Sequence, residues 1–331
     1  MSQIIVDIQN ILNKARKQAY QRIHVAMVQA YWLIGKRIVE EDQQGNARAT
    51  YGKALIANLS TQLTKDLGQG FSQRNLEQMR AFYLTFVIPQ TASAELQTPE
   101  FQLSWSHYLM LMGIKELDER RFYEIESIEN NWSLRELKRQ YNAGLYLRLA
   151  LSRDKAGIKQ LAEKGQIIEK TSDIIKDPYI LEFLQLETQH QYSENDLETA
   201  LVDKLEHFLL ELGKGFTFVA RQKRITFDEK HFYIDLVFYN RLLACFVLID
   251  LKIGELHHQD LGQMQMYVNY YDRFAKLETE NKTIGIILCQ KKSDLVVEIT
   301  LPENNDQIFA SRYQTVLPSN EQLRQLLIQT P

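Results

Sequence analysis

Two acids and a lysine in the second half of the chain stand where they could share a metal ion. Asp235 interrupts the apolar run FYIDLVF, where an unpaired carboxylate is costly. Asp250 and Lys252 end the next apolar run, and alternate residues of a strand share one face. If the two strands form a hairpin, Asp235 lies beside Asp250, and such close carboxylates need a cation between them.

Magnesium suits this pattern because it binds one or two carboxylates and keeps water and phosphate oxygens as its other ligands. Mn²⁺ is the alternative ion. Lys252 would orient the attacking water and stabilise the charge that develops on a phosphate. The pattern therefore indicates metal-assisted hydrolysis of a phosphodiester bond.

The elements around these residues fall into two regions. Up to about residue 150 the apolar spacing predicts helices over 4–38, 51–67 and 115–128, one that starts after an N-cap at Ser72, and one that starts at Ser133. From about residue 170 we expect an α/β core. Its predicted elements are a short helix over 176–184, a long helix over 193–215, strands over 215–222, 231–240 and 242–252, a helix over 260–275, a strand over 283–290, a short strand over 308–313 and a last helix after Pro318.

Composition narrows the class of protein. The chain has 331 residues, of which 45% are hydrophobic and 24% are charged, which excludes a disordered protein. Its longest uncharged apolar run, Leu242 to Ile249, is too short to span a bilayer, and the N-terminus does not resemble a signal peptide. Two cysteines are too few for a disulfide framework. We therefore expect a soluble, cytoplasmic protein without a membrane partner.

Several phrases resemble the bacterial YhcG family, among them YWLIGKRIVEE, GFSQRNLEQMRAFY, FLLELGKGFTFVARQKRI and IDLKIGELHHQDLGQMQMYV. The resemblance covers nearly the whole chain. It implies an α+β protein with an all-helical N-terminal domain and a C-terminal restriction-endonuclease-like PD-(D/E)XK core, a mixed sheet flanked by helices. The expected bounds are 1–155 for the helical domain, 156–185 for a connecting segment and 186–331 for the nuclease domain. The chain departs from the pattern because no proline precedes Asp235 and because Asp250 replaces the commoner glutamate.

The resemblance also implies further site residues. The acid near the start of the first core helix would be Glu194, a third metal ligand, with Glu198 one turn later as the alternative; either acid could instead favour the helix dipole. Gln263 and Tyr267 would reach the site from the helix after the third strand, or else hold a strand from the edge of that helix. With Asp235, Asp250 and Lys252, these complete the predicted catalytic set.

Basic and polar residues elsewhere are candidates for contact with nucleic acid. Arg74 and Asn75 open a helix in a phrase similar to a recognition helix, and Arg221 and Arg224 flank the first core strand. A second basic set contains Lys138, Arg139, Arg148 and Arg153. For each group an ordinary solvated surface is the alternative. Glu211 is expected at the surface or beside Lys214.

These residues predict a Mg²⁺-dependent DNA endonuclease of DNA processing or genome defence. DNA, a second copy of the chain, and restriction or defence-system proteins are its expected partners. The alternative is a catalytically silent nuclease fold that binds DNA or serves as a scaffold in a defence complex. A core with only a structural role would gain stability by losing the three buried charges, so their presence argues against that alternative. RNA is a weaker candidate substrate.

Overall fold

The computed structural model describes residues 2–44, 49–86, 100–151, 153, 155–186 and 192–329. The chain divides into two compact units, Met1–Lys138 and Arg139–Pro331. Each unit has its own hydrophobic core. Within the described residues, none of the helices combines the length and the apolarity needed to span a bilayer.

The first unit is helical, as predicted. Its helices are α1 (Ser2–Gln44), α2 (Ala49–Leu67), α3 (Gln73–Phe86), α4 (Trp105–Leu111), α5 (Leu117–Glu129) and the start of α6 (Leu134–Asn142). α1 and α3 touch closely at Gly35, where an added Cβ would lie 2.0 Å from the carbonyl oxygen of Met79. Ser72 caps α3 as predicted, since its hydroxyl accepts a hydrogen bond from the amide of Asn75 at 3.3 Å.

The N-terminal turns of α1 differ from the rest of the helix. Ile4, Ile8 and Ile11 are 61%, 51% and 67% exposed, although their spacing is that of an apolar helix face. Among the α1 residues whose burial is described, the first buried ones are Val28 and Trp32, where the helix packs in the core of its unit. The apolar spacing therefore predicted the helix correctly, but it did not predict that the first turns are exposed.

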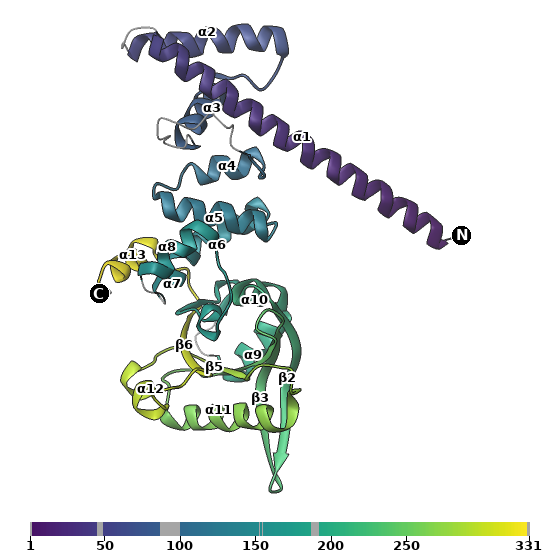
Figure 1. Ribbon diagram of the computed structural model, residues 1–331, viewed down its shortest axis with the longest axis vertical. Coiled ribbons are helices and arrows are strands. Elements are labelled where there is room, and N and C mark those ends of the chain that lie inside the picture. Colours follow the sequence, from purple (N-terminus) through teal and green to yellow (C-terminus); the bar gives the residue numbers. More distant parts are fainter. Residues whose placement is uncertain are drawn as a thin grey trace. The chain divides into compact units, whose positions relative to one another are not determined.

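The second unit is built on a mixed sheet (Figure 1). Its elements are α7 (Leu145–Leu151), α8 (Lys155–Lys164), β1 (Tyr179–Ile180), α9 (Glu194–Asp203), α10 (Leu205–Leu212), β2 (Phe216–Phe227), β3 (Lys230–Asn240), β4 (Cys245–Leu251), α11 (His258–Tyr270), β5 (Ile284–Cys289), α12 (Asp294–Thr300), β6 (Ile308–Gln314) and α13 (Asn320–Gln329). Short 3₁₀ turns at Thr171–Ile174 and Glu182–Leu184 and a π turn at Tyr271–Ala275 complete it.

The described strands lie in the order β1-β6-β5-β4-β3-β2. β2, β3 and β4 are antiparallel neighbours, whereas β4, β5, β6 and β1 run parallel. One face of the sheet packs against α9 and α10 through Leu197 and Phe208, and the other against α11 through Leu261 and Val268. β4 and β5 are buried along nearly their whole length, as the apolar runs of these strands predict.

Two local predictions need correction. Residues 176–184 do not form a short helix, because Tyr179 and Ile180 pair with β6 as the strand β1, and a 3₁₀ turn follows. The predicted long helix is two helices, with a break at Lys204, whose backbone leaves the helical region at φ −115° and ψ 35°. The compact units meet after residue 138, and α7 packs on α13 within the second unit. The expected domain bounds at residues 155 and 186 stay predictions.

Candidate active site

Asp235 and Asp250 lie on the adjacent strands β3 and β4. The two strands pair with Leu236 opposite Ile249, and one further step of this register places Asp235 opposite Asp250. The Asp235 Oδ2 atom accepts a hydrogen bond from the backbone amide of Leu251 at 2.8 Å, which ties the carboxylate to β4. The predicted hairpin therefore brings the two acids together.

The alternation of side chains between the two faces of the sheet is interrupted in β3 at Asp235. Ile234 packs in the hydrophobic cluster beside α11, whereas Leu236 packs in the cluster beside α9 and α10. Regular alternation would put these two residues on the same face, so the strand is twisted between them. On β2, the neighbouring Gln222 has a left-handed backbone with φ 44°. This local twist presents Asp235 at the end of β4 and not inside the packed sheet.

Lys252 follows β4 on the same side as Asp250. Its ammonium lies 2.9 Å from Asp250 Oδ2 and 4.0 Å from Glu194 Oε2. Asp250 is 3% exposed, and among the described residues no other group donates a hydrogen bond to its Oδ2 atom. Asp235, Asp250 and Lys252 thus converge as the spacing of the sequence predicts.

The pKa values of both acids are raised. Burial, followed by the nearby charge of Asp235, raises the pKa of Asp250 to about 7, against the opposing effect of Lys252. Burial is also the main reason why the pKa of Asp235 is raised. Burial lowers the pKa of Lys252, but Asp250, Glu194 and Asp235 together outweigh it and raise that pKa above its ordinary value. A cation beside Asp250 would therefore be favoured over a proton as the pH rises above 7.

The structure brings both candidate helix acids to the site. Glu194 Oε1 accepts a hydrogen bond from the backbone amide of Ile253 at 3.1 Å, which places it beside Lys252. Glu198 is 2% exposed and lies on the opposite side of the site, where Arg221 approaches its Oε1 atom at 3.3 Å. Burial, opposed by the Gln222 hydrogen bond and assisted by Asp235, raises the pKa of Glu198. The choice of Glu194 over Glu198 as a ligand therefore stays a prediction.

Gln222 on β2 also belongs to this site. Its side-chain amide donates to Asp235 Oδ1 at 3.0 Å and also donates to Glu198 Oε2. The amide thus holds two acids that repel each other at a fixed separation. The sequence carries no signal for this role, because it depends on the left-handed backbone of Gln222.

The contacts of Gln263 and Tyr267 agree with the alternative role given above, in which they hold a strand in place. Gln263 donates to the Tyr267 hydroxyl at 2.8 Å, and that hydroxyl donates to the carbonyl oxygen of Tyr233 on β3 at 2.9 Å. Burial, followed by the charges of Asp250 and Asp235, raises the pKa of Tyr267 to about 12, so the phenol stays protonated. The pair thus anchors β3 close to Asp235.

The donor set fits a hard divalent cation. In the part of the chain that the structure describes, no group of three or more His, Cys, Asp or Glu side chains is arranged as a complete metal site. The Asp235–Asp250 pair nevertheless supplies the one or two carboxylates that Mg²⁺ takes from proteins that also bind phosphates. Among the described residues, the buried Oδ2 atom of Asp250 meets the ammonium of Lys252 and accepts no other hydrogen bond, so it can serve as a ligand to a cation. The residues present therefore fit this metal.

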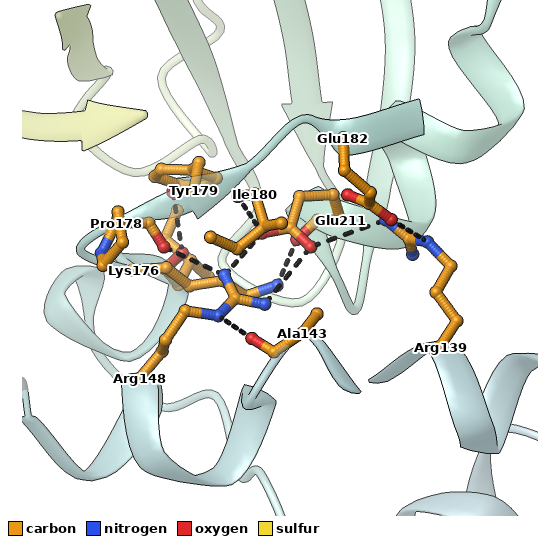
Figure 2. Close-up of polar contacts among 10 residues, drawn as sticks. Arg139, Ala143, Arg148, Lys176, Pro178, Tyr179, Ile180, Glu182 and Glu211 are labelled. Atoms are coloured by element: carbon orange, nitrogen blue, oxygen red, sulfur yellow. Dashed lines mark hydrogen bonds and ion pairs between the residues drawn. The ribbon is translucent and has the colours of Figure 1, made fainter. Parts of the chain in front are cut away.

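The candidate nucleic-acid contacts lie in different environments. Arg74, Lys138 and Arg224 are exposed, whereas the Asn75 side chain donates to the carbonyl of Gly70 at 3.1 Å. Arg139 is occupied inside the second unit, where its Nε atom donates to Glu182 at 3.0 Å (Figure 2). We therefore do not include Arg139 among the residues proposed to contact nucleic acid.

The expectation that Glu211 lies at the surface is wrong. Glu211 and Arg148 are both 0% exposed, and their charged atoms are 2.6 Å apart (Figure 2). Arg148 also donates to the carbonyl oxygens of Ala143 and Pro178, at 2.8 and 2.9 Å. Arg148 is consequently an interior residue and not part of a solvated basic face, and the neighbouring Arg153 approaches Asp173 at 3.6 Å.

Comparison with known proteins gives matches over both units. Residues 172–328 match the YhcG PDDEXK nuclease domain, and residues 7–148 match the DUF1016 N-terminal domain. The protein YhcG of Escherichia coli (strain K12) is 38% identical over 346 residues, which cover 97% of this chain and 92% of that protein.

Two solved structures are similar to part of this chain. A repair endonuclease from Pyrococcus abyssi is 18% identical with a TM-score of 0.27, covering 38% of this chain and 50% of that chain. EndoMS in its apo form is 13% identical with a TM-score of 0.25, covering 39% of this chain and 48% of that chain. This chain thus spans about half the length of these solved chains. On the similarity to YhcG along nearly its whole length, the chain belongs to the YhcG family, and residues 172–328 form the PDDEXK nuclease domain of that family.

Proposed function

We propose that this nuclease domain is a metal-dependent DNA endonuclease with Mg²⁺ as its ion and Mn²⁺ as a substitute. The observation that carries the proposal is the convergence of Asp235, Asp250 and Lys252 in one buried corner, with Lys252 Nζ 2.9 Å from Asp250 Oδ2. Asp235 and Asp250 would hold the ion, and Glu194 would assist them from the start of α9. A bound ion would supply positive charge to the scissile phosphate and lower the pKa of a water molecule.

The protein's own residues would perform the remaining tasks. Hydrolysis forms a bond between the water oxygen and phosphorus and breaks the bond to the leaving oxygen, which departs with the electron pair and takes up a proton. Lys252 has three N–H donors, and one of them faces Asp250. The others would orient the water and stabilise the crowded, charged phosphate. Tyr267 would act as a positioning residue because it fixes the backbone of β3 at Tyr233.

A cleavage assay with the full chain tests this proposal. Linear, single-stranded, mismatched and branched DNA would be incubated with Mg²⁺ or Mn²⁺, with RNA as a further substrate. We expect cleavage that EDTA abolishes and that Asp250→Ala and Lys252→Ala each abolish, while binding of DNA in Lys252→Ala survives. Lys282→Ala is the matched control, because the Lys282 side chain is 66% exposed and pairs with Asp306 at 3.6 Å.

The assay also distinguishes an active nuclease from the alternative, a nuclease fold that binds DNA without cutting it. Binding of DNA without cleavage under every ion would favour that alternative. Cleavage that persists in Asp250→Ala would mean that another site or another protein is responsible. A divalent ion refined between Asp235 and Asp250 in a crystal grown with DNA would be direct support. The assembly into a homo-oligomer, the defence partners, the cytoplasmic location and a role in DNA processing or genome defence stay predictions.

A further inference from the structure

A two-stranded arm leaves the sheet directly beside the candidate active site. β4 pairs with β3 only from Leu236 to Asn240, so the part of β3 before Asp235 pairs, among the described strands, with β2 alone. The arm ends in a tight turn at Asp228 and Glu229, both of which have left-handed backbones, with φ 50° and 59°, as hairpin turns of this kind require. Figure 1 shows the arm extending past α11.

One face of the arm fixes it to the body of the unit. Ile225 is buried opposite Phe232, and the rings of Phe227 and Phe232 stack with their centroids 4.9 Å apart. Phe227 also stacks on Tyr270 at the end of α11, with centroids 6.3 Å apart. At its base the carbonyl of Tyr233 is held by the Tyr267 hydroxyl. The arm is therefore supported and does not depend on a ligand for its shape.

The opposite face of the arm is polar and continues into the active site. Its cross-strand pairs are Arg224 with Tyr233 and Thr226 with His231, and the next pair toward the body is Gln222 with Asp235. Thr226 Oγ1 lies 2.9 Å from His231 Nδ1 across one pair, and Gln222 donates to Asp235 across the other. Ile225 and Ile234, which alternate with Arg224 and Tyr233 along the two strands, pack on the α11 side of the sheet. Between these two contacts Arg224 is exposed, and Tyr233 is 48% exposed.

We propose that this face, formed by Arg224, Tyr233 and His231, binds a single-stranded stretch of DNA that leads into the active site. The inference rests on the proposed nuclease function and adds the form of the substrate beside the cut. An exposed aromatic ring next to an arginine suits single strands, because bases stack on the ring while the guanidinium meets the phosphates.

Length and charge favour a single strand over a duplex. From Asp235 to His231 the arm extends roughly 13 Å, at ~3.3 Å per residue, which matches about four stacked nucleotides. The tip carries Asp228 and Glu229, and these acids would face the phosphates of a duplex if the arm entered a groove. A single strand can run along the Arg224–Tyr233 face and leave before it reaches the tip.

Binding of the full chain to three labelled DNAs in EDTA tests this proposal without cleavage. The DNAs are a 20-nucleotide single strand, a blunt duplex of the same sequence, and that duplex with a single-stranded overhang; the readout is fluorescence anisotropy. We expect Tyr233→Leu to weaken the binding of the single strand and the overhang on the order of 5- to 150-fold. Tyr233→Phe keeps the ring and should bind like the native chain.

The contribution of Arg224 is tested by the salt dependence of DNA binding. Arg224→Gln should lower the slope of log K against log salt for the single strand by about 0.7, the value for one lost phosphate contact. Lys282→Gln is the control, and it should leave both the affinity and the slope unchanged. Equal losses for the blunt duplex and the single strand would overturn the proposal, as would native affinity in both Tyr233→Leu and Arg224→Gln.

The same experiment distinguishes failure of the arm from failure of the nuclease proposal. If the native chain binds single strands through Tyr233 but cuts no DNA with Mg²⁺ or Mn²⁺, the nuclease proposal fails and the binding arm stands. If the native chain cuts DNA while the arm variants bind normally, the arm proposal fails and the catalytic one stands. If the native chain binds no single strand, the arm proposal is wrong whatever the cleavage result.

Discussion

Replacing Arg148 by alanine should destabilise the second unit severely, because it leaves the carboxylate of Glu211 buried without its main partner. Both side chains are 0% exposed and their charged atoms are 2.6 Å apart. The backbone amide of Ile180 also donates to Glu211 at 3.0 Å, so the carboxylate cannot turn toward water without breaking that contact. Removing one partner of such a buried pair costs about 3–5 kcal/mol of unfolding free energy.

Urea denaturation followed by circular dichroism measures this loss. With an m-value of about 2 kcal/mol/M, the midpoint for the second unit should fall by about 2 M. Lys282→Ala removes an exposed pair in the same unit and should change the stability by less than about 1 kcal/mol. The double variant Arg148→Met, Glu211→Leu should be more stable than Arg148→Ala, because it leaves no buried charge. A loss below about 1 kcal/mol in Arg148→Ala would refute this reasoning.

The same pair predicts a dependence of stability on pH. Burial acts to raise the pKa of Glu211, but Arg148 and Lys176 outweigh it and hold that pKa below its ordinary value. The stabilisation is therefore fully present above about pH 4.3, the ordinary value for an unfolded glutamate, and is lost as the pH falls through the lower folded value. In Glu211→Gln this part of the acid sensitivity should disappear. An unchanged pH profile would contradict the assignment.

Three further predictions concern the metal site and the packing. Because protonation of Asp250, whose pKa burial raises to about 7, competes with a cation, the thermal stabilisation by Mg²⁺ should grow from pH 6 to pH 8 in a thermal-shift titration; equal stabilisation at all pH values would contradict this. Gly35→Ala places a Cβ 2.0 Å from Met79 O and should lower stability by about 1–3 kcal/mol, whereas Gly262→Ala, with nothing within 4 Å, should raise it by up to about 1 kcal/mol. Ser193→Ala removes the hydroxyl that accepts from the amide of Asp196 at 3.2 Å and should cost about 1 kcal/mol in a urea titration, since it unties the start of α9.

The convergence of Asp235, Asp250 and Lys252 could be predicted from the sequence because its geometry follows from short-range rules. Alternation along β4 places Asp250 and Lys252 on one side, and a hairpin with few loop residues leaves little freedom in how Asp235 is placed. The predicted strands over 215–222, 231–240, 242–252, 283–290 and 308–313 and the helix over 260–275 depend on the same local patterns, and the structure contains each of them in that order.

What could not be predicted depends on contacts between distant residues. Arg148 and Glu211 are 63 positions apart, and each alone resembles a surface residue. The role of Gln222 requires a left-handed backbone that a glutamine rarely adopts, so its type gives no indication of it. The strand β1 has two residues, too few for a pattern, and it forms only because β6 offers an edge.

The place of β2 in the sheet has a consequence for how copies of this protein behave at high concentration. Among the described strands it lies at an edge, where free amide and carbonyl groups can recruit a strand from another molecule. The charges of Arg221 and Lys223 and the irregular backbone of Gln222 interrupt this edge halfway along its length. Residues on and beside the candidate active site would thus also keep neighbouring molecules from joining sheet to sheet.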